Sequence, residues 1–514
     1  MQKHNPTQDH IEVLKKIASK LGGTSSVRVD AIVVKTIGHD KKVHGLIIGS
    51  DVEIAKRVQK DLIKQYGNVV HAEGAFWRFR KTRWDAIPEH ELRLTIHAYD
   101  GAFYYLPSGE PAAVKLGKGR IDSVINECGV LCADPAFFDE RHVGINSASG
   151  FIRFATDGST TLEPHDPVHR CRHTLPGHWH VGASITPPES SLLHKLLEGI
   201  FRGDIDAKEK ADLLSEICGV AALGYATKLM KPRAVVLWGK KAENGKSQIL
   251  DMARGLVSTT AVCSVPPGKM GDERHIVGLV AKLLNATDEL SSAHAIASDK
   301  FKSVVTGEPI DGRDVYTKRV EFRSMAQNIH ATNTLPSFQG GMDRGVQRRL
   351  LLLVFNRTIP EEERIELLGQ KIAENEADLL LAWAVAGASR AVKNRNFMIP
   401  KSCKAALDEW IYSADPVLAW IHQCVKAQPT NEPNIKRVRT RDAHADFKFW
   451  AKEEGFNEER LPELNGFTQR VTANAAGVEY KRTADGRWFE RMIITSESQE
   501  ESQDAPEFGG ESPF

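Results

Sequence analysis

The chain has 514 residues, of which 41% are hydrophobic and 26% charged, a balance typical of globular domains rather than of a disordered chain. Its net charge of +1 excludes a uniformly basic nucleic-acid-binding protein, so any surface for nucleic acid has to be local. Seven irregularly spaced cysteines argue against a disulfide framework, and no stretch resembles a signal peptide or a transmembrane span, so we expect a cytoplasmic protein without membrane contact.

The N-terminal part, residues 1–186, is expected to be a mixed α/β region. Hydrophobic periodicity and turn residues predict its elements. These are helices over residues 8–21, 53–67 and 88–101, strands over 27–35 and around a turn in 75–84, and a strand over 150–156. Helical spacing over residues 187–230 then predicts a helical segment.

The stretch LWGKKAENGKSQIL (residues 237–250) has the composition of a phosphate-binding loop. Five residues, rather than the usual four, separate its first glycine from the Gly-Lys-Ser tripeptide. A β-rich run (234–238) precedes the loop, and a helical pattern (247–257) follows it, so loop N–H groups and a helix N-terminus would meet the phosphates. The predicted nucleotide-binding residues are Gly239, Asn244, Gly245, Lys246 and Ser247.

Three further apolar runs carry polar residues of catalytic types. Residues 282–290 end in Asp288-Glu289, residues 328–333 end in Asn333, and residues 350–355 directly follow Arg348-Arg349. Polar residues at the carboxyl ends of strands are what a parallel α/β sheet with its ligand at that edge requires. The sequence therefore predicts an α/β fold with a nucleotide site at one sheet edge.

The motifs NGKS (244–247), TDE (287–289), ATNTLP (331–336) and GVQRRLLLLVF (345–355), with the charged stretch 302–322 between them, resemble the superfamily 3 helicases. The chain is similar in particular to the phage and plasmid primase-helicase family shared with poxviruses. This resemblance implies an AAA+-like P-loop ATPase core that uses ATP and Mg²⁺ and assembles as a homo-hexameric ring. The implied function is a DNA helicase that translocates on single-stranded DNA during replication of a phage, plasmid or integrated element in a bacterial cell.

The resemblance also implies roles for single residues. Lys246 would hold the β- and γ-phosphates, and Ser247 and Asp288 would hold Mg²⁺. Glu289 would polarise the attacking water, and Asn333 would sense the γ-phosphate.

Two further roles concern other chains and DNA. Arg349, preferred over Arg348, would act as an arginine finger in the neighbouring subunit; a surface ion pair is the alternative. Lys318 and Arg319 would face the ring channel and contact DNA phosphates, unless they belong to a solvated turn.

The C-terminal part combines helical patterns with an Asp485-Gly486 hairpin signal, which suggests a winged-helix domain for DNA contact. A charged surface without a ligand is the alternative. The expected basic face comprises Lys436, Arg437, Arg439, Arg441, Arg470, Lys481, Arg482 and Arg487.

The resemblance and the patterns together predict six parts. They are the N-terminal region 1–186, a helical collar 187–231, the ATPase domain 232–358, a helical segment 359–399, the winged-helix-like domain 400–495 and a disordered acidic tail 496–514. The tail ends in Pro513-Phe514 and resembles the acidic tail of bacterial single-stranded DNA-binding proteins, which suggests docking on host replication proteins.

Three other possibilities concern metal binding, primer synthesis and a non-enzymatic function. The His/Cys-rich stretch 165–180 lacks a CxxC pair, and its alternation argues against zinc. Residues 1–140 show no convincing pair of metal-binding acids for primer synthesis. The alternative function is a non-enzymatic origin- or operator-binding protein whose nucleotide site is only structural.

Overall fold

The computed structural model describes most of the chain, with several gaps. Described are residues 32–36, 39–43, 45–288, 295–313, 320–339, 341–456, 458 and 461–495, with only the backbone for 32–36 and 39–43. The helix expected over residues 8–21, Glu289, Lys318, Arg319 and the acidic tail lie outside these residues. The chain divides into two compact units, residues 1–146 with 163–174 and residues 147–162 with 175–514.

The first unit combines three main helices with short antiparallel strands. Its elements are β1 (Ile32–Thr36), β2 (His39–Val43), α2 (Asp51–Tyr66), β3 (Val69–Ala72), β4 (Ala75–Arg80), β5 (Arg83–Ala86), α3 (Glu89–His97), β6 (Phe103–Tyr105), β7 (Pro111–Ala113), α4 (Lys118–Leu131) and η1 (Pro167–His169). Helix α2 starts where the Ser50 side chain accepts a hydrogen bond from the Glu53 N–H, and ends at Gly67. Its buried face, including Val58 and Leu62, packs in one core with residues of α3 and α4.

The second unit is built around a five-stranded parallel sheet. The strands are β11 (Ala234–Trp238), β12 (Val262–Cys263), β13 (Leu284–Thr287), β16 (Gln327–Thr332) and β17 (Leu350–Val354). They lie in the order β12-β13-β16-β11-β17, and every neighbouring pair is parallel. The predicted parallel α/β sheet is therefore confirmed, and β12 is a strand that the sequence patterns missed.

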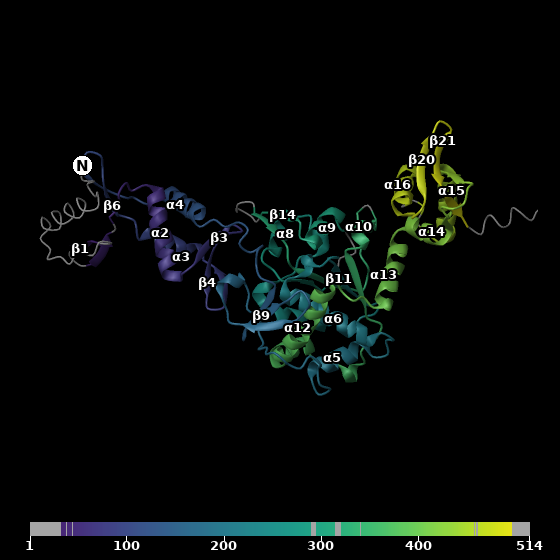
Figure 1. Ribbon diagram of the computed structural model, residues 1–514, viewed down its shortest axis with the longest axis horizontal. Coiled ribbons are helices and arrows are strands. Elements are labelled where there is room, and N and C mark those ends of the chain that lie inside the picture. The colour runs from purple at the N-terminus through teal and green to yellow at the C-terminus, as the bar shows by residue number, and fades with distance from the viewer. Residues whose placement is uncertain are drawn as a thin grey trace, which may run out of the picture. The chain divides into compact units, whose positions relative to one another are not determined.

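Helices and short turns surround this sheet (Figure 1). They are α5 (Leu192–Phe201), α6 (Ala207–Leu223), η2 (Ala226–Lys228), α7 (Lys246–Val257), η3 (Thr259–Ala261), η4 (Pro267–Lys269), α8 (Glu273–Ile276), η5 (Val277–Leu279), α9 (Ser298–Thr306), α10 (Arg344–Gln347), η6 (Glu361–Glu363), α11 (Leu368–Asn375) and α12 (Ala377–Asn394). Strands β14 (Pro309–Gly312) and β15 (Val320–Arg323) form a separate antiparallel pair. Strands β8 (Gly144–Ser147), β9 (Gly150–Phe154) and β10 (Thr160–Glu163) precede all of these.

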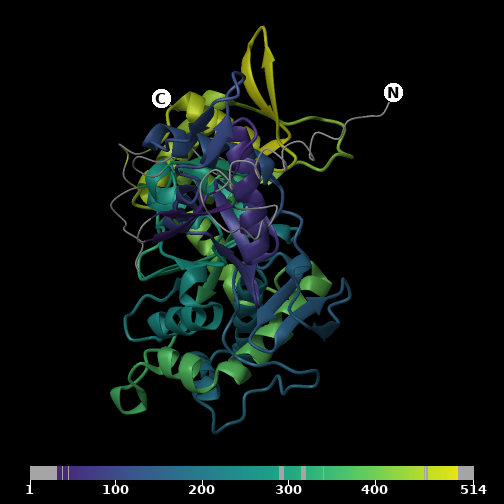
Figure 2. The ribbon, with the colours of Figure 1, turned by 90° about the vertical axis from the view of Figure 1, so that its left-hand side faces the viewer.

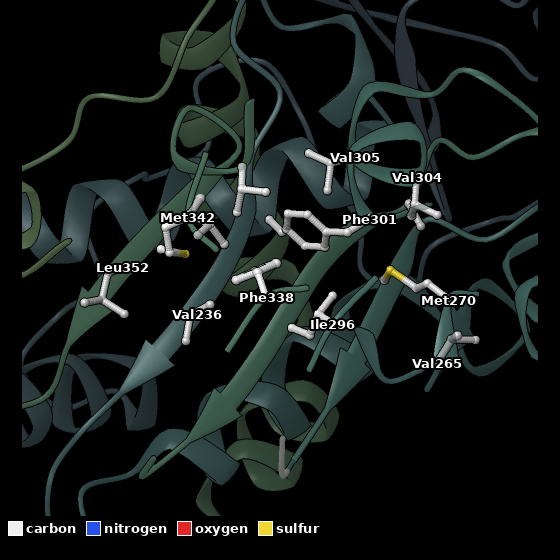
Figure 3. Close-up of a cluster of buried hydrophobic side chains, with 14 of the residues drawn as sticks. Val236, Val265, Met270, Ile296, Phe301, Val304, Val305, Phe338, Met342 and Leu352 are labelled. Carbon is white, nitrogen blue, oxygen red and sulfur yellow. The ribbon is translucent and has the colours of Figure 1, made fainter. Parts of the chain in front are cut away.

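A hydrophobic cluster packs against one face of the sheet (Figure 3). Val236 of β11 and Leu352 of β17 contribute from the sheet, and Phe301 of α9 packs on Phe338 with ring centroids 5.2 Å apart. Alternate residues of a strand point to opposite faces, so this burial fixes which residues of β11 and β17 face away from the cluster. The cluster therefore buries this face of the sheet.

The C-terminal part of the second unit has its own core. It contains α13 (Lys401–Ala414), α14 (Pro416–Cys424), β18 (Val425–Ala427), β19 (Arg437–Arg439), α15 (Thr440–Glu453), α16 (Leu464–Asn474), β20 (Glu479–Thr483), β21 (Gly486–Glu490) and β22 (Met492–Ile494). Trp420, Phe447, Phe467 and Phe489 pack together in this core. The hairpin expected at Asp485-Gly486 is confirmed as β20–β21, drawn in yellow in Figures 1 and 2.

Within the described part of the chain, no helix combines the length and the apolar character that crossing a bilayer demands.

Four predicted regions are confirmed. Helix α2 covers most of 53–67, strands β4 and β5 lie in and next to 75–84, helix α3 lies in 88–101, and helices α5 and α6 lie in 187–230. The six-part division of the chain stays a prediction.

A buried histidine in the central sheet predicts acid sensitivity. His330 of β16 shares a 2.7 Å hydrogen bond with the Thr287 hydroxyl, and burial lowers its pKa to about 3. The unfolded chain therefore binds a proton near pH 6.5, whereas the folded chain does not, so stability is lost as pH falls from about 6.5 towards 3. We expect His330→Asn to flatten the fall of the thermal midpoint between pH 7 and 4, with the exposed His90→Asn as control. Equal pH dependence in wild type and His330→Asn would refute this assignment.

Candidate functional site

The segment between β11 and α7, residues 239–245, forms a tight turn that only glycine permits at two positions. We call it the β11–α7 loop. A side-chain carbon on Gly239 would lie 2.1 Å from Asn244 Nδ2, and Gly245, at the N-terminus of α7, has φ +82°. Both positions therefore exclude larger residues. Gly239 packs directly against Asn244, so the first glycine keeps a structural purpose despite the lengthened spacing.

Lys246 is the first residue of α7, and two amide oxygens hold its ammonium group. Its Nζ lies 2.8 Å from Asn244 Oδ1 and 2.7 Å from Asn333 Oδ1. The residue is only 8% exposed, and burial lowers its pKa. Because both acceptors are neutral, the positive charge remains available to an anion.

Asn333 reaches Lys246 because β11 and β16 are neighbours. Trp238 at the end of β11 lies opposite Thr332 at the end of β16, so the residues after both strands meet at one sheet edge. The Trp238 indole N–H also donates to the Asn333 carbonyl at 3.3 Å. The sequence placed Lys246 and Asn333 in one site, and the structure brings them together.

Asp288 follows β13, the strand on the other side of β16. Its carboxylate lies 3.1 Å from the Arg254 guanidinium of α7, which also pairs with Asp251 at 2.9 Å. The exposed Ser247 and Asp288 both line the same cavity as Lys246. The two predicted metal ligands therefore line the same cavity, and the ion pair with Arg254 connects Asp288 to α7.

This cavity has a volume of about 1320 Å³, larger than many small-molecule sites. Its floor is the β11–α7 loop and the end of β16, and its other walls come from α5 and residues 359–368. Those walls contribute both acidic and basic residues, and the sequence patterns missed the basic ones, namely Lys195, Arg202 and Arg364. Arg202 is ion-paired with Glu198 and Glu363. No motif marks these basic residues, because they lie outside the strand–loop–helix pattern that identified the loop.

Glu243 connects the lengthened loop to the segment 359–368. Its backbone is left-handed, with φ 62°, and its carboxylate accepts two hydrogen bonds from Arg364, at 2.6 and 3.0 Å. The Glu243 carbonyl also accepts from the Ile359 N–H at 2.8 Å. The loop is thereby joined to the 359–368 wall, and Arg364 neutralises the one acid of the loop.

The Glu243–Arg364 pair predicts a charge effect on anion binding. Removing the guanidinium leaves a carboxylate unpaired beside the cavity, so Arg364→Ala should weaken binding of an anionic ligand there by about 3- to 30-fold. Glu243→Gln in the same chain should restore most of the loss, because the repelling charge is gone. A titration with a fluorescent ATP analogue measures both, and a double variant as weak as Arg364→Ala would contradict the neutralising role of Arg364.

The two candidate finger residues lie at the opposite sheet edge. Leu350 at the start of β17 is opposite Ala234 at the start of β11, so Arg348 and Arg349 are at the amino ends of the strands. Arg349 is only 8% exposed and donates to the Gly345 carbonyl at 2.8 Å, whereas Arg348 is exposed. Neither lines the cavity that contains Lys246, as far as the described residues show.

The basic residues of the C-terminal part do not form one uniform face. Arg470 lies 3.3 Å from the buried Asp415 at the start of α14, which is a structural contact. Arg437 pairs with Glu490 at 2.8 Å and Lys481 with Glu479 at 3.0 Å. The other members of the expected face are exposed, namely Lys436, Arg439, Arg441, Arg482 and Arg487.

Two histidines of the 165–180 stretch, His165 and His169, have polar partners within the first unit. His165 Nδ1 lies 2.9 Å from Asn146 Oδ1, and His169 Nε2 lies 3.1 Å from Glu163 Oε2. No group of three or more potential metal-binding side chains occurs among the residues that the structure describes.

Comparisons with known proteins find a matching family model and matching solved structures. A family of unknown function (DUF5906) matches residues 237–349, less than half of the chain but including the β11–α7 loop, Asp288 and Asn333. One apo structure of the NrS-1 C-terminal region, in its A form, has 12% identity and a TM-score of 0.41, covering 85% of this chain and 98% of that chain. A second apo structure of the same region has 13% identity and a TM-score of 0.42, covering 86% and 100%. No curated protein matches the chain.

Proposed function

We propose that the second unit is an ATP-hydrolysing motor that translocates on single-stranded DNA and separates DNA strands during replication of a phage, plasmid or integrated element. The observation that carries this proposal is the position of the Lys246 ammonium group. It is held by Asn244 and Asn333 at the N-terminus of a helix, at the carboxyl edge of a parallel sheet. A buried cation with two neutral amide partners is suited to a ligand that carries several negative charges.

The residues of the cavity fit ATP with Mg²⁺. The loop N–H groups, the first turn of α7 and Lys246 would bind the β- and γ-phosphates, and Asn333 would contact the terminal phosphate. Ser247 and Asp288 offer the oxygen ligands that Mg²⁺ prefers, and the ion would supply charge neutralisation on the phosphates. The apolar wall residues Leu196 and Ile359 offer a surface for the base. Glu289 remains the proposed residue for orienting water.

The position of the arginines supports the proposed ring assembly. Arg348 and Arg349 lie at the sheet edge opposite to the cavity of their own chain, so either would serve a site only in a neighbouring chain. We favour the exposed Arg348 as the finger, because the guanidinium of Arg349 is already used within its own chain. The proposal also includes an ATPase core of the superfamily 3 type, assembly as a homo-hexamer, DNA contacts in the ring channel through Lys318 and Arg319, and a winged-helix role for the C-terminal domain.

Strand displacement tests this function. Wild-type protein with ATP and Mg²⁺ should release the labelled strand of a forked DNA duplex, and a non-hydrolysable ATP analogue should not support release. Equal release with ATP and with the analogue would mean that the protein separates strands by binding alone. Absence of release with ATP, while single-stranded DNA is bound, would support the alternative of a DNA-binding protein with a structural nucleotide site.

A further inference from the structure

The C-terminal sheet carries an aromatic residue on the face away from its core. In the sheet of order β19-β21-β20, Phe489 points into the core, where its ring centroid lies 6.3 Å from that of Phe467. Neighbouring residues of a strand point to opposite faces, so Trp488 lies on the outer face. Trp488 is only partly buried, and its indole nitrogen lies 3.7 Å from where a side chain on Gly486 would begin. The indole thus lies along the sheet surface over a residue that has no side chain.

Positive charges flank this indole on both neighbouring strands. Arg439 of β19 and Lys481 of β20 are the direct cross-strand partners of Trp488. The guanidinium carbon of Arg439 lies 5.1 Å from the Trp488 ring centroid, within the range of a cation–π contact. The hairpin places a cation, an aromatic ring and a second cation side by side in one row.

The acidic residues of this face lie at the other end of the strands. Glu479 and Glu490 are cross-strand neighbours away from the turn, and the Glu479 carboxylate lies 3.0 Å from the Lys481 ammonium group. Arg482 and Arg487 are exposed near the turn, but they are the chain neighbours of Lys481 and Trp488 and so lie on the opposite face of the sheet. The cations beside Trp488 are therefore Arg439, which contacts the ring, and Lys481 on the other neighbouring strand.

We propose that Trp488, together with Arg439 and Lys481, is a stacking site for single-stranded nucleic acid. Unpaired bases expose flat faces that stack on indole and guanidinium planes, and their phosphates match the flanking cations. A duplex satisfies the cations but hides its base faces inside the helix, so it leaves the indole unused. This site is separate from the ATP cavity and goes beyond the motor function, because it binds a strand without nucleotide.

The test is binding of the full-length protein to a fluorescent oligothymidine and to a duplex of equal length, without nucleotide. Since stacking of one base contributes strongly to single-strand affinity, Trp488→Ala should weaken oligothymidine binding by about 5- to 100-fold. Trp488→Phe should retain most of the affinity, and duplex binding should change less than twofold. Arg439→Ala should also reduce the salt slope by about 0.7 for one lost phosphate contact, whereas Trp488→Ala should leave it unchanged.

Phe449 provides a matched control, because it is a large aromatic residue of the same domain, on α15, and is 57% exposed. Phe449→Ala should bind both DNAs like wild type. Single-strand binding by Trp488→Ala within twofold of wild type would overturn the proposal, and so would equal losses for single strand and duplex.

Photocrosslinking separates this site from any other DNA contact. An oligonucleotide with 5-iodouracil should crosslink to the peptide that contains Trp488, and crosslinks found only in other peptides would overturn the proposal. The crosslink should persist in Lys246→Ala protein, so it does not depend on whether the cavity hydrolyses ATP.

Discussion

Lys246→Ala is expected to abolish ATP hydrolysis, with a loss of at least about 100-fold in rate. The ammonium group is the buried cation at the proposed phosphate position, 2.8 and 2.7 Å from its two amide partners. Its removal takes away charge stabilisation that no neighbouring side chain can replace at the same point. Phosphate release measured under saturating ATP and Mg²⁺ gives the rate, and ATP titration separates lost binding from lost turnover.

The same loop supplies matched controls for this substitution. Lys240 and Lys241 are exposed, and the contact of Lys241 with Asn244 uses the backbone carbonyl, which alanine retains. Lys240→Ala and Lys241→Ala should therefore hydrolyse ATP within about threefold of wild type, as expected for surface charges. Loss of activity in these variants equal to that of Lys246→Ala would mean that general positive charge, rather than the held ammonium, is what matters.

Arg348→Ala is expected to lose about 10³- to 10⁵-fold in hydrolysis rate, as for removal of an arginine finger. The parallel register places Arg348 at the sheet edge opposite the cavity of its own chain, so in the proposed ring its guanidinium would act on the site of a neighbouring chain. Inactive Arg348→Ala protein mixed with inactive Lys246→Ala protein should regain activity. Some interfaces then combine an intact cavity from one chain with an intact arginine from the other.

Arg349→Ala provides the comparison within the same pair of residues. Its guanidinium donates to the Gly345 carbonyl and is almost fully buried, so the substitution should lower the thermal midpoint as well as the activity. If mixing restores activity to Arg349→Ala but not to Arg348→Ala, the buried arginine is the finger. No recovery for either variant, with assemblies shown to form, would exclude catalysis between chains.

The sequence predicted the sheet and the central site because both depend on local patterns. Strand β11 and helix α7 have clear apolar periodicity, and the carboxyl ends of parallel strands meet at one edge, so Lys246 and Asn333 were placed together. Strand β12 was missed because two residues, Val262–Cys263, are too short for any periodic signal. The prediction of the site therefore rests mainly on apolar strand patterns that end in a polar residue.

The remaining features of the site depend on contacts between distant residues. Glu243 carries a negative charge beside the proposed phosphate site, and its partner Arg364 lies 121 residues further along the chain. Arg348 and Arg349 give the same sequence signal, and only the contact with Gly345 distinguishes the buried residue from the exposed one. The contact between Arg439 and Trp488 exists because β19 pairs with β21. These two strands are far apart along the chain, so no local sequence pattern indicates the contact.

The most direct measurement of the central claim is the rate of ATP hydrolysis by the wild-type protein, with Mg²⁺, as single-stranded DNA is added. The account predicts hydrolysis above that of Lys246→Ala protein and a rate that rises with DNA concentration to a plateau. Hydrolysis no faster than that of Lys246→Ala protein at every DNA concentration would contradict it.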